Sequence, residues 1–303
     1  MDKLMIFISD ESGDTGVPHS INASKLYTIS YALVINKNPD SLKHLISSAS
    51  SASKEALGTG LSEWKKLGKD NKNNPQKLHK FIQNFYTKMN ENGELVLFGF
   101  YIVDKQEIEQ NDGDSNNKKR IKDAADQGYY FILKRVLACM KKIHYEKGLY
   151  PSNGEPALKW IIDNNSKEFI SRQKKIAQDF EKNMNVKIEG PEFISKKEKH
   201  SHYKVNAIKI VDLLGGIASK IFESYAICNT YCNSLDCFRE ANCDNKMFKV
   251  WEEILKCAMN QQIYLEEKDN IIWRWKGIQY YPALSRSKHD RFFTEDGFFS
   301  TLS

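Results

Sequence analysis

Hydrophobic and polar positions divide the chain into strand-like and helix-like segments. Short apolar runs rich in β-branched and aromatic residues predict strands at 4–8, 26–35, 94–103 and 157–163, with one further strand or pair of strands at 185–195. Apolar residues at helical spacing predict helices at about 40–56, 75–89, 129–145, 167–184 and 203–227. Beyond these segments, 247–259 is also helix-like, and an aromatic stretch at 271–281 alternates like a strand.

The order of these elements predicts an α/β fold. Three strands come first, interrupted by a helical insertion at about 40–90, and strands then alternate with helices. Consecutive strands favour an antiparallel meander, whereas alternation favours parallel crossovers. This mixed order is typical of an RNase H-like fold, with a five-stranded mixed sheet flanked by helices. We therefore predict an RNase H-like domain at 1–227 and an appended C-terminal lobe, packed on that core, at 228–303.

Composition narrows the class of protein. The 303 residues are 41% hydrophobic and 28% charged, as in soluble globular proteins, and no apolar run approaches the roughly 20 residues of a membrane span. The first apolar run is too short for a secretory signal, so we expect a cytoplasmic protein that does not bind membranes. A net charge of +6 permits a polyanionic partner. The four cysteines Cys228, Cys232, Cys237 and Cys243 lack zinc-knuckle spacing, which favours reduced thiols over a structural metal site.

Carboxylates follow the first predicted strand in the stretch "SDESGDT". In the predicted topology the first and fourth strands are parallel neighbours, so Asp10 and Asp163 should emerge side by side at their carboxyl ends, where open α/β sheets bind ligands. Asp212 lies within an apolar helix, and Gly215 and Gly216 beside it suggest close approach of another backbone or a ligand. A buried carboxylate is costly unless a cation pairs with it. A metal ion shared by the three aspartates would remove that cost.

Such a cluster predicts phosphodiester chemistry. Clustered acids stay ionised together only with positive charge nearby, and their hard oxygen ligands select Mg²⁺ or Mn²⁺. Two such ions about 4 Å apart are the usual device for in-line hydrolysis of a phosphodiester. Glu11 and Asp14 are additional candidate metal ligands because they share the first motif.

Each aspartate also has a purely structural interpretation. "DESGD" is compatible with a polar turn in which Gly13 adopts a positive φ. Asp163 is well placed to cap the helix that follows it, which for this residue alone is the better explanation. Asp212 could form a buried salt bridge with Lys209 or another base. Their joint placement at strand one, strand four and the last helix of the domain favours the catalytic hypothesis.

Three motifs resemble the RNase H-like family known as domain of unknown function 3800. They are "FISDESGDTG", "WIIDNN" and "NAIKIVDLLGGI", and they span most of residues 1–227. The resemblance implies an RNase H-like domain and a metal-dependent nuclease. The last motif departs from the family pattern, because Lys209 stands where glutamine is common and Val211 replaces an alanine.

A fourth element, "SEWKKLGK", also resembles the family. Glu63 would add a fourth carboxylate to the site, and Lys65 would contact the scissile phosphate. An exposed charged loop explains these two residues equally well.

Basic and aromatic segments add weaker signals. Lysines 65, 66, 69 and 72, residues 118–120 and the segment 196–204 could follow a phosphate backbone. Trp273, Trp275, Tyr280 and Tyr281 suit base stacking, although such aromatics more often close a small core. His200 and His202 could assist metal binding or proton transfer, or simply belong to an exposed basic loop.

Two other functional classes fit poorly. Haloacid dehalogenase phosphatases need a second aspartate at the place of Ser12, and an EF-hand calcium loop needs a different ligand pattern and a closing glutamate. The leading hypothesis is therefore a nuclease that uses Mg²⁺ or Mn²⁺, with Asp10, Asp163 and Asp212, and in supporting roles Glu63 and Lys65, acting on RNA or DNA. The alternative is a non-catalytic module of the same fold that binds nucleic acid or a protein.

Overall fold

A computed structural model of the chain describes residues 5–13, 24–35, 40–91, 95–106, 108, 117–147, 157–164, 166–184, 186–196, 202–232, 262–263, 273–274 and 278–281. Its strands are β1 (Met5–Ser12), β2 (Leu26–Ile35), β3 (Leu95–Asp104), β4 (Ala157–Asp163), β5 (Lys187–Ile194), β6 (Gln262–Ile263), β7 (Trp273–Arg274) and β8 (Ile278–Tyr281). Its helices are α1 (Ser41–Leu57), the 3-10 helix η1 (Trp64–Lys66), α2 (Lys69–Lys72), α3 (Pro75–Glu91), α5 (Asn117–Lys147), α6 (Lys167–Met184) and α7 (His202–Cys232).

The predicted α/β fold with a mixed sheet is confirmed. The strand order is β5-β4-β1-β2-β3, with β8 added at the edge beside β3. β2 pairs antiparallel with both β1 and β3, whereas β4 runs parallel to β1 and to β5. The sheet therefore joins an antiparallel meander to two parallel crossovers, and β1 lies at the junction between them.

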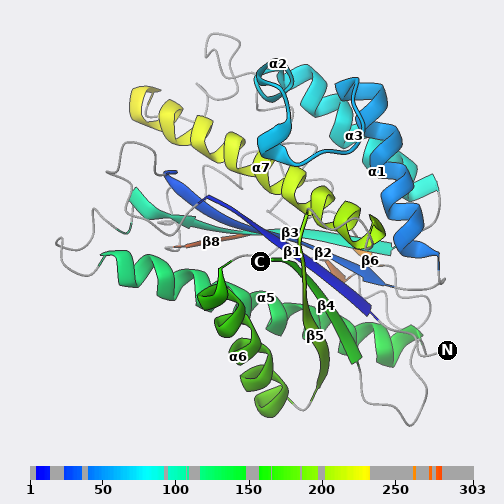
Figure 1. Cartoon of the computed structure of the whole chain (residues 1–303), viewed down its shortest axis with the longest axis vertical. Coiled ribbons are helices and arrows are strands. Elements are labelled where there is room, and N and C mark those ends of the chain that lie inside the picture. Colours follow the sequence, from blue (N-terminus) through cyan, green and yellow to red (C-terminus); the bar gives the residue numbers. More distant parts are fainter. Residues whose placement is uncertain are drawn as a thin grey trace.

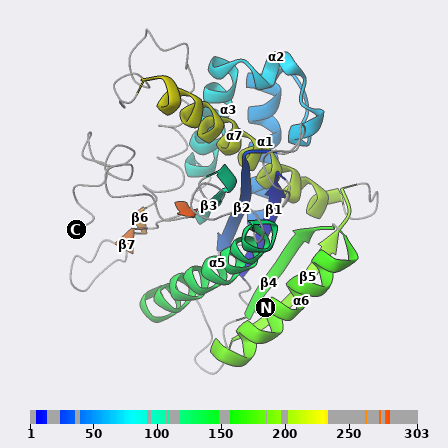
Figure 2. The ribbon, with the colours of Figure 1, turned by 90° about the vertical axis from the view of Figure 1, so that its left-hand side faces the viewer.

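Helices cover both faces of the sheet (Figure 1). On one face α7 lies directly against the strands. The helices α1 and α3 come between β2 and β3; α1 packs on α7, and α3 packs on α1 and β3. On the other face α5 and α6 pack against the sheet, and Figure 2 shows this layering from the side. Because α7 has the sheet on one side and α1 on the other, its apolar residues surround it instead of forming one stripe.

The first strand extends further than predicted. The apolar run ends at Ile8, but β1 continues to Ser12 because β2 offers ten residues for pairing, and Asp10, Glu11 and Ser12 pair with Ser30, Ile29 and Thr28. The turn begins only at Gly13, which has a φ of 90° as its turn interpretation predicts. Polar side chains at the end of an apolar run are thus still carried by the sheet.

Other helices and strands also differ from their predicted bounds. α5 begins at Asn117 instead of 129 because its buried stripe already starts with Ile121, Ala124 and Ala125. Residues 187–194 form one strand. β8 extends the main sheet, and the predicted helix at 247–259 lies outside the described residues. In the part of the chain that the structure describes, no helix is long and apolar enough to cross a membrane.

A candidate acidic site at the carboxyl ends of β1 and β4

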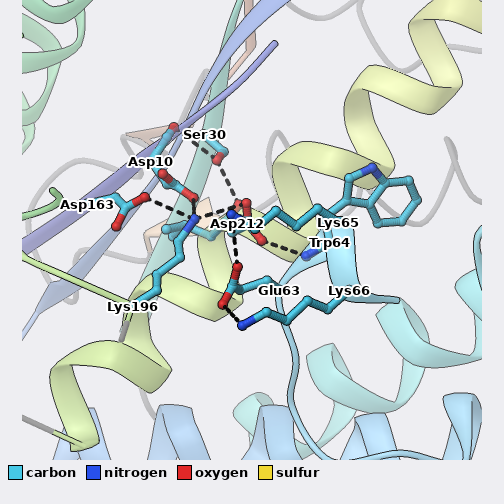
Figure 3. A network of polar contacts seen from close by, with 10 residues as sticks. Asp10, Ser30, Glu63, Trp64, Lys65, Lys66, Asp163, Lys196 and Asp212 are labelled. Carbon is cyan, nitrogen blue, oxygen red and sulfur yellow. Dashed lines mark hydrogen bonds and ion pairs between the residues drawn. The ribbon is translucent and has the colours of Figure 1, made fainter. Parts of the chain in front are cut away.

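Side chains alternate between the two faces of a β-sheet, and this alternation places Asp10 and Asp163 on the same face. Ile8 and Ile161, two residues before them, belong to the core under α7, so Asp10 and Asp163 face α7 as well. Ser9 pairs with Ile162 in the parallel register, which brings the two aspartates to the same edge of the sheet. Asp212 reaches this edge from α7 (Figure 3).

The three aspartates surround one amino group, that of Lys196 (Figure 3). Lys196 Nζ lies 2.7 Å from Asp10 Oδ2, 3.2 Å from Asp163 Oδ2 and 3.2 Å from Asp212 Oδ1. The side chains of Asp10, Asp212 and Lys196 are well shielded, with exposed fractions of 3%, 13% and 12%, whereas that of Asp163 is 25% exposed. In the described ranges, no group of three or more His, Cys, Asp or Glu side chains stands ready to hold a metal ion. The cation among these carboxylates is the lysine.

Burial and charge act in opposite directions on these groups. Burial raises the pKa of Asp10 well above its ordinary value, and the positive charge of Lys196 opposes that rise only in part. The pKa of Asp163 is raised for the same reasons. Burial alone would lower the pKa of Lys196, but the charges of Asp10, Asp212 and Asp163 raise it above its ordinary value. The lysine is therefore held as an ammonium.

Close packing fixes α7 against β1. The Ser30 hydroxyl donates to the carbonyl oxygen of Val211 at 2.7 Å and lies 3.3 Å from that of Asp10, which links the backbones that carry Asp10 and Asp212. A Cβ on Gly215 would lie 2.5 Å from Ser30 Oγ, so only glycine fits there. The close approach that the two glycines suggested is present, and it involves protein atoms.

Gly216 allows an equally close approach of η1, through its first residue, Trp64. A Cβ on Gly216 would lie 2.1 Å from the Trp64 ring, so the indole rests directly on the helix backbone. In this position the Trp64 backbone N–H donates to Asp212 Oδ2 at 2.6 Å. Glu63, the residue before it, is thereby placed beside the acidic site (Figure 3).

Glu63 is buried and paired with two lysines. Its carboxylate lies 2.5 Å from Lys66 Nζ and 3.4 Å from Lys65 Nζ. Burial acts to raise the pKa of Glu63, but hydrogen bonds from Lys66 and Lys65 lower it below its ordinary value. The Lys65 side chain is 76% exposed, so its amine remains open to a ligand from solvent.

Glu11 does not join this cluster. It follows Asp10 on β1, so its side chain lies on the α5 face of the sheet, next to Tyr27 and Tyr129. Burial raises the pKa of Glu11 to about 7, with partial opposition from the tyrosine hydroxyls and Arg172. As a ligand of a metal shared with Asp10 it is on the wrong face. Asp14 lies outside the described residues.

The structural alternatives have mixed outcomes. Ser166, not Asp163, caps α6, because its hydroxyl accepts a hydrogen bond from the Phe169 N–H at 3.2 Å. Asp212 does form a salt bridge, but with Lys196, while Lys209 contacts Asn206. Sequence reasoning placed Lys196 only in a basic loop. The position directly after a strand that neighbours β4 was the signal that could have brought it to the site.

The weaker sequence signals are only partly described. His202 is exposed, and its Nδ1 lies 2.9 Å from the Asn206 amide nitrogen. His200, Cys237 and Cys243 lie outside the described residues, as do the side chains of Cys228, Cys232 and the aromatic stretch at 273–281.

No protein-family model matches the chain, and no curated protein matches it at a significant level. The case for a function therefore rests on the geometry of this site.

Proposed function

We propose that the protein is a metal-dependent nuclease with an RNase H-like fold and site. The observation that carries the proposal is the meeting of Asp10, Asp163 and Asp212 around one cation at the carboxyl ends of β1 and β4. The strand order β5-β4-β1-β2-β3, with β2 antiparallel to its neighbours, supports the same fold family. The three motifs that resemble domain of unknown function 3800 contain these three aspartates.

The residues fit a hard divalent cation. All three side chains offer carboxylate oxygens, the donors that Mg²⁺ and Mn²⁺ prefer, and they already hold a positive group in a shielded place. Asp10, Asp163 and Asp212 would hold the metal, with Glu63 beside them. When bound, a pair of such ions supplies an activated water and neutralises the charge that develops on the leaving oxygen.

The protein's own residues supply orientation and charge. Asp10 and Asp163 are carried by neighbouring strands, and Asp212 is fixed by the Trp64 N–H, so the carboxylates have little freedom to move. Lys65, with its exposed amine, would contact a phosphate oxygen of the substrate. The exposed lysines near η1 and α2 would neutralise further phosphates along the strand.

A cleavage assay on labelled RNA, DNA and hybrid strands tests the proposal. We expect cleavage in Mg²⁺ or Mn²⁺, none in chelator, and none by Asp10→Ala or Asp163→Ala. Asp126→Asn is the matched control, because Asp126 on α5 is also partly buried but belongs to a different ion pair. Its carboxylate lies 3.1 Å from the guanidinium of Arg172. Binding that is unchanged in chelator, with no cleavage of any substrate, would instead support a non-catalytic module.

A further inference from the structure

The cation at the centre of the site belongs to the protein itself. Lys196 Nζ contacts all three aspartates, so when every group is ionised one positive charge faces three negative charges. The centre keeps a net charge of −2 and attracts more positive charge than one ammonium provides. A divalent ion in the same place would balance the carboxylates better.

The carboxylates and the amine differ in how firmly they are held. Asp10, Asp163 and Asp212 sit on β1, β4 and α7, and Ser30 ties the first and last of these elements together. Lys196 lies in a turn after β5 ends at Ile194, and its amine is carried on a flexible four-carbon stem. The amine can therefore leave by rotation of its side chain while the carboxylates stay in place.

We propose that Lys196 is a placeholder that competes with the divalent metal for this site. Without metal, its ammonium neutralises part of the buried negative charge and keeps the site folded. When a divalent cation binds, the amine withdraws and its contacts with the three aspartates are replaced. The inference rests on the proposed function, because it concerns the same metal site, and it makes metal affinity a balance between two cations.

Titration calorimetry with Mn²⁺ on the full chain tests the competition, using wild type, Lys196→Met and Lys204→Met. Lys204 is the matched control, because its side chain is 14% exposed, close to the 12% of Lys196, but among the described residues it contacts the carboxylate of Glu192 and the ring of Tyr203 instead of three aspartates. We expect Lys196→Met to bind Mn²⁺ on the order of tenfold more tightly than wild type, since a competing charge has been removed. Lys204→Met should bind like wild type.

Thermal unfolding gives a second readout that does not depend on activity. In chelator, Lys196→Met should melt below wild type, because three shielded carboxylates lose their counter-ion. In Mn²⁺ it should regain that loss, so the metal-induced rise in Tm is larger than in wild type. If Lys196→Met does not fold in chelator, refolding it with Mn²⁺ and repeating the titration with Lys196→Gln give the same comparison.

The outcomes separate the inference from the proposed function. Equal or weaker Mn²⁺ affinity in the Lys196 variants, or a variant that Mn²⁺ does not rescue, would overturn the placeholder role and leave a metal site standing. No Mn²⁺ binding by wild type or any variant, together with no cleavage, would overturn the proposed function and the inference with it.

Discussion

Asp10 and Glu11 are neighbours on β1, yet the two faces of the sheet give them opposite surroundings. Asp10 faces α7 and shares an ammonium with two other carboxylates, whereas Glu11 faces α5 and lies among tyrosines with Arg172 further away. Burial raises the pKa of both, but in the described part of the chain Asp10 has an ammonium in direct contact, whereas Arg172 opposes the rise for Glu11 only in part. A carboxylate cluster becomes a candidate for metal chemistry through the charges around it, not through its place in a motif.

The largest expected effect is a difference in cleavage activity between variants on the two faces of the sheet. Asp10→Asn should lower metal-dependent cleavage by about a hundredfold or more, because it removes a charged group from the reacting centre. Glu11→Gln should stay close to wild type. Initial cleavage rates at saturating Mg²⁺ measure both variants, with circular dichroism to establish that each is folded. Equal losses in both would mean that the two faces do not differ in function.

A difference in pH dependence should distinguish the faces by stability. Below about pH 4.5 Glu11 is protonated in both the folded and unfolded states; as the pH rises toward 7, the unfolded state ionises while the folded state resists. Between pH 4.5 and pH 8, the unfolding free energy of wild type should therefore fall by at most about 3 kcal/mol relative to that of Glu11→Gln. Urea unfolding at several pH values measures this. Parallel curves for the two proteins would show that Glu11 ionises normally in the fold.

A smaller effect concerns the packing that supports the α7 face. Gly216→Ala should cost about 2 kcal/mol of unfolding free energy and lower cleavage, because its methyl group displaces Trp64 and with it the N–H that holds Asp212. Gly60→Ala is the control, since a Cβ there meets nothing within 4 Å. Denaturant unfolding and cleavage rates measure both. A neutral Gly216→Ala would show that Trp64 does not rest on this helix.

The smallest effect should come from the link between α7 and β1. Ser30→Ala removes a buried hydrogen bond to the Val211 carbonyl, which should cost about 1 kcal/mol. The same substitution at Ser51, which makes a solvent-exposed hydrogen bond to Glu55 within α1, should cost less. Thermal unfolding compares the two. If Ser51→Ala were the more damaging change, the proposed tie between Asp10 and Asp212 would lose its support.

The periodicity of apolar residues predicted most of the fold, because burial of one face of each element determines both the sequence pattern and the packing. Apolar runs located β1 to β5, which are five of the six strands of the main sheet, and helical spacing located α1, α3, α6 and most of α7. The end of β1 was missed because strand pairing, not side-chain polarity, decides where a strand stops. The start of α5 was missed because its first buried residues are separated by polar ones.

The candidate site was only partly predictable. The topology of parallel strands was enough to expect Asp10 and Asp163 at one edge, and the glycines in α7 pointed to close packing near Asp212. Strand alternation predicts that the Glu11 side chain lies on the α5 face of the sheet, but only once β1 is known to continue past Ile8. Lys196 was missed although it follows the strand that pairs with β4, because a turn after β5 gives no periodic signal for the direction of a side chain.

The most direct test of the account is anomalous diffraction at the manganese absorption edge from crystals soaked in Mn²⁺. We predict an anomalous peak among the carboxylates of Asp10, Asp163 and Asp212, with the Lys196 amine moved away from them. An amine still in contact with all three aspartates, with no peak between them, would contradict the claim that these residues form a divalent metal site.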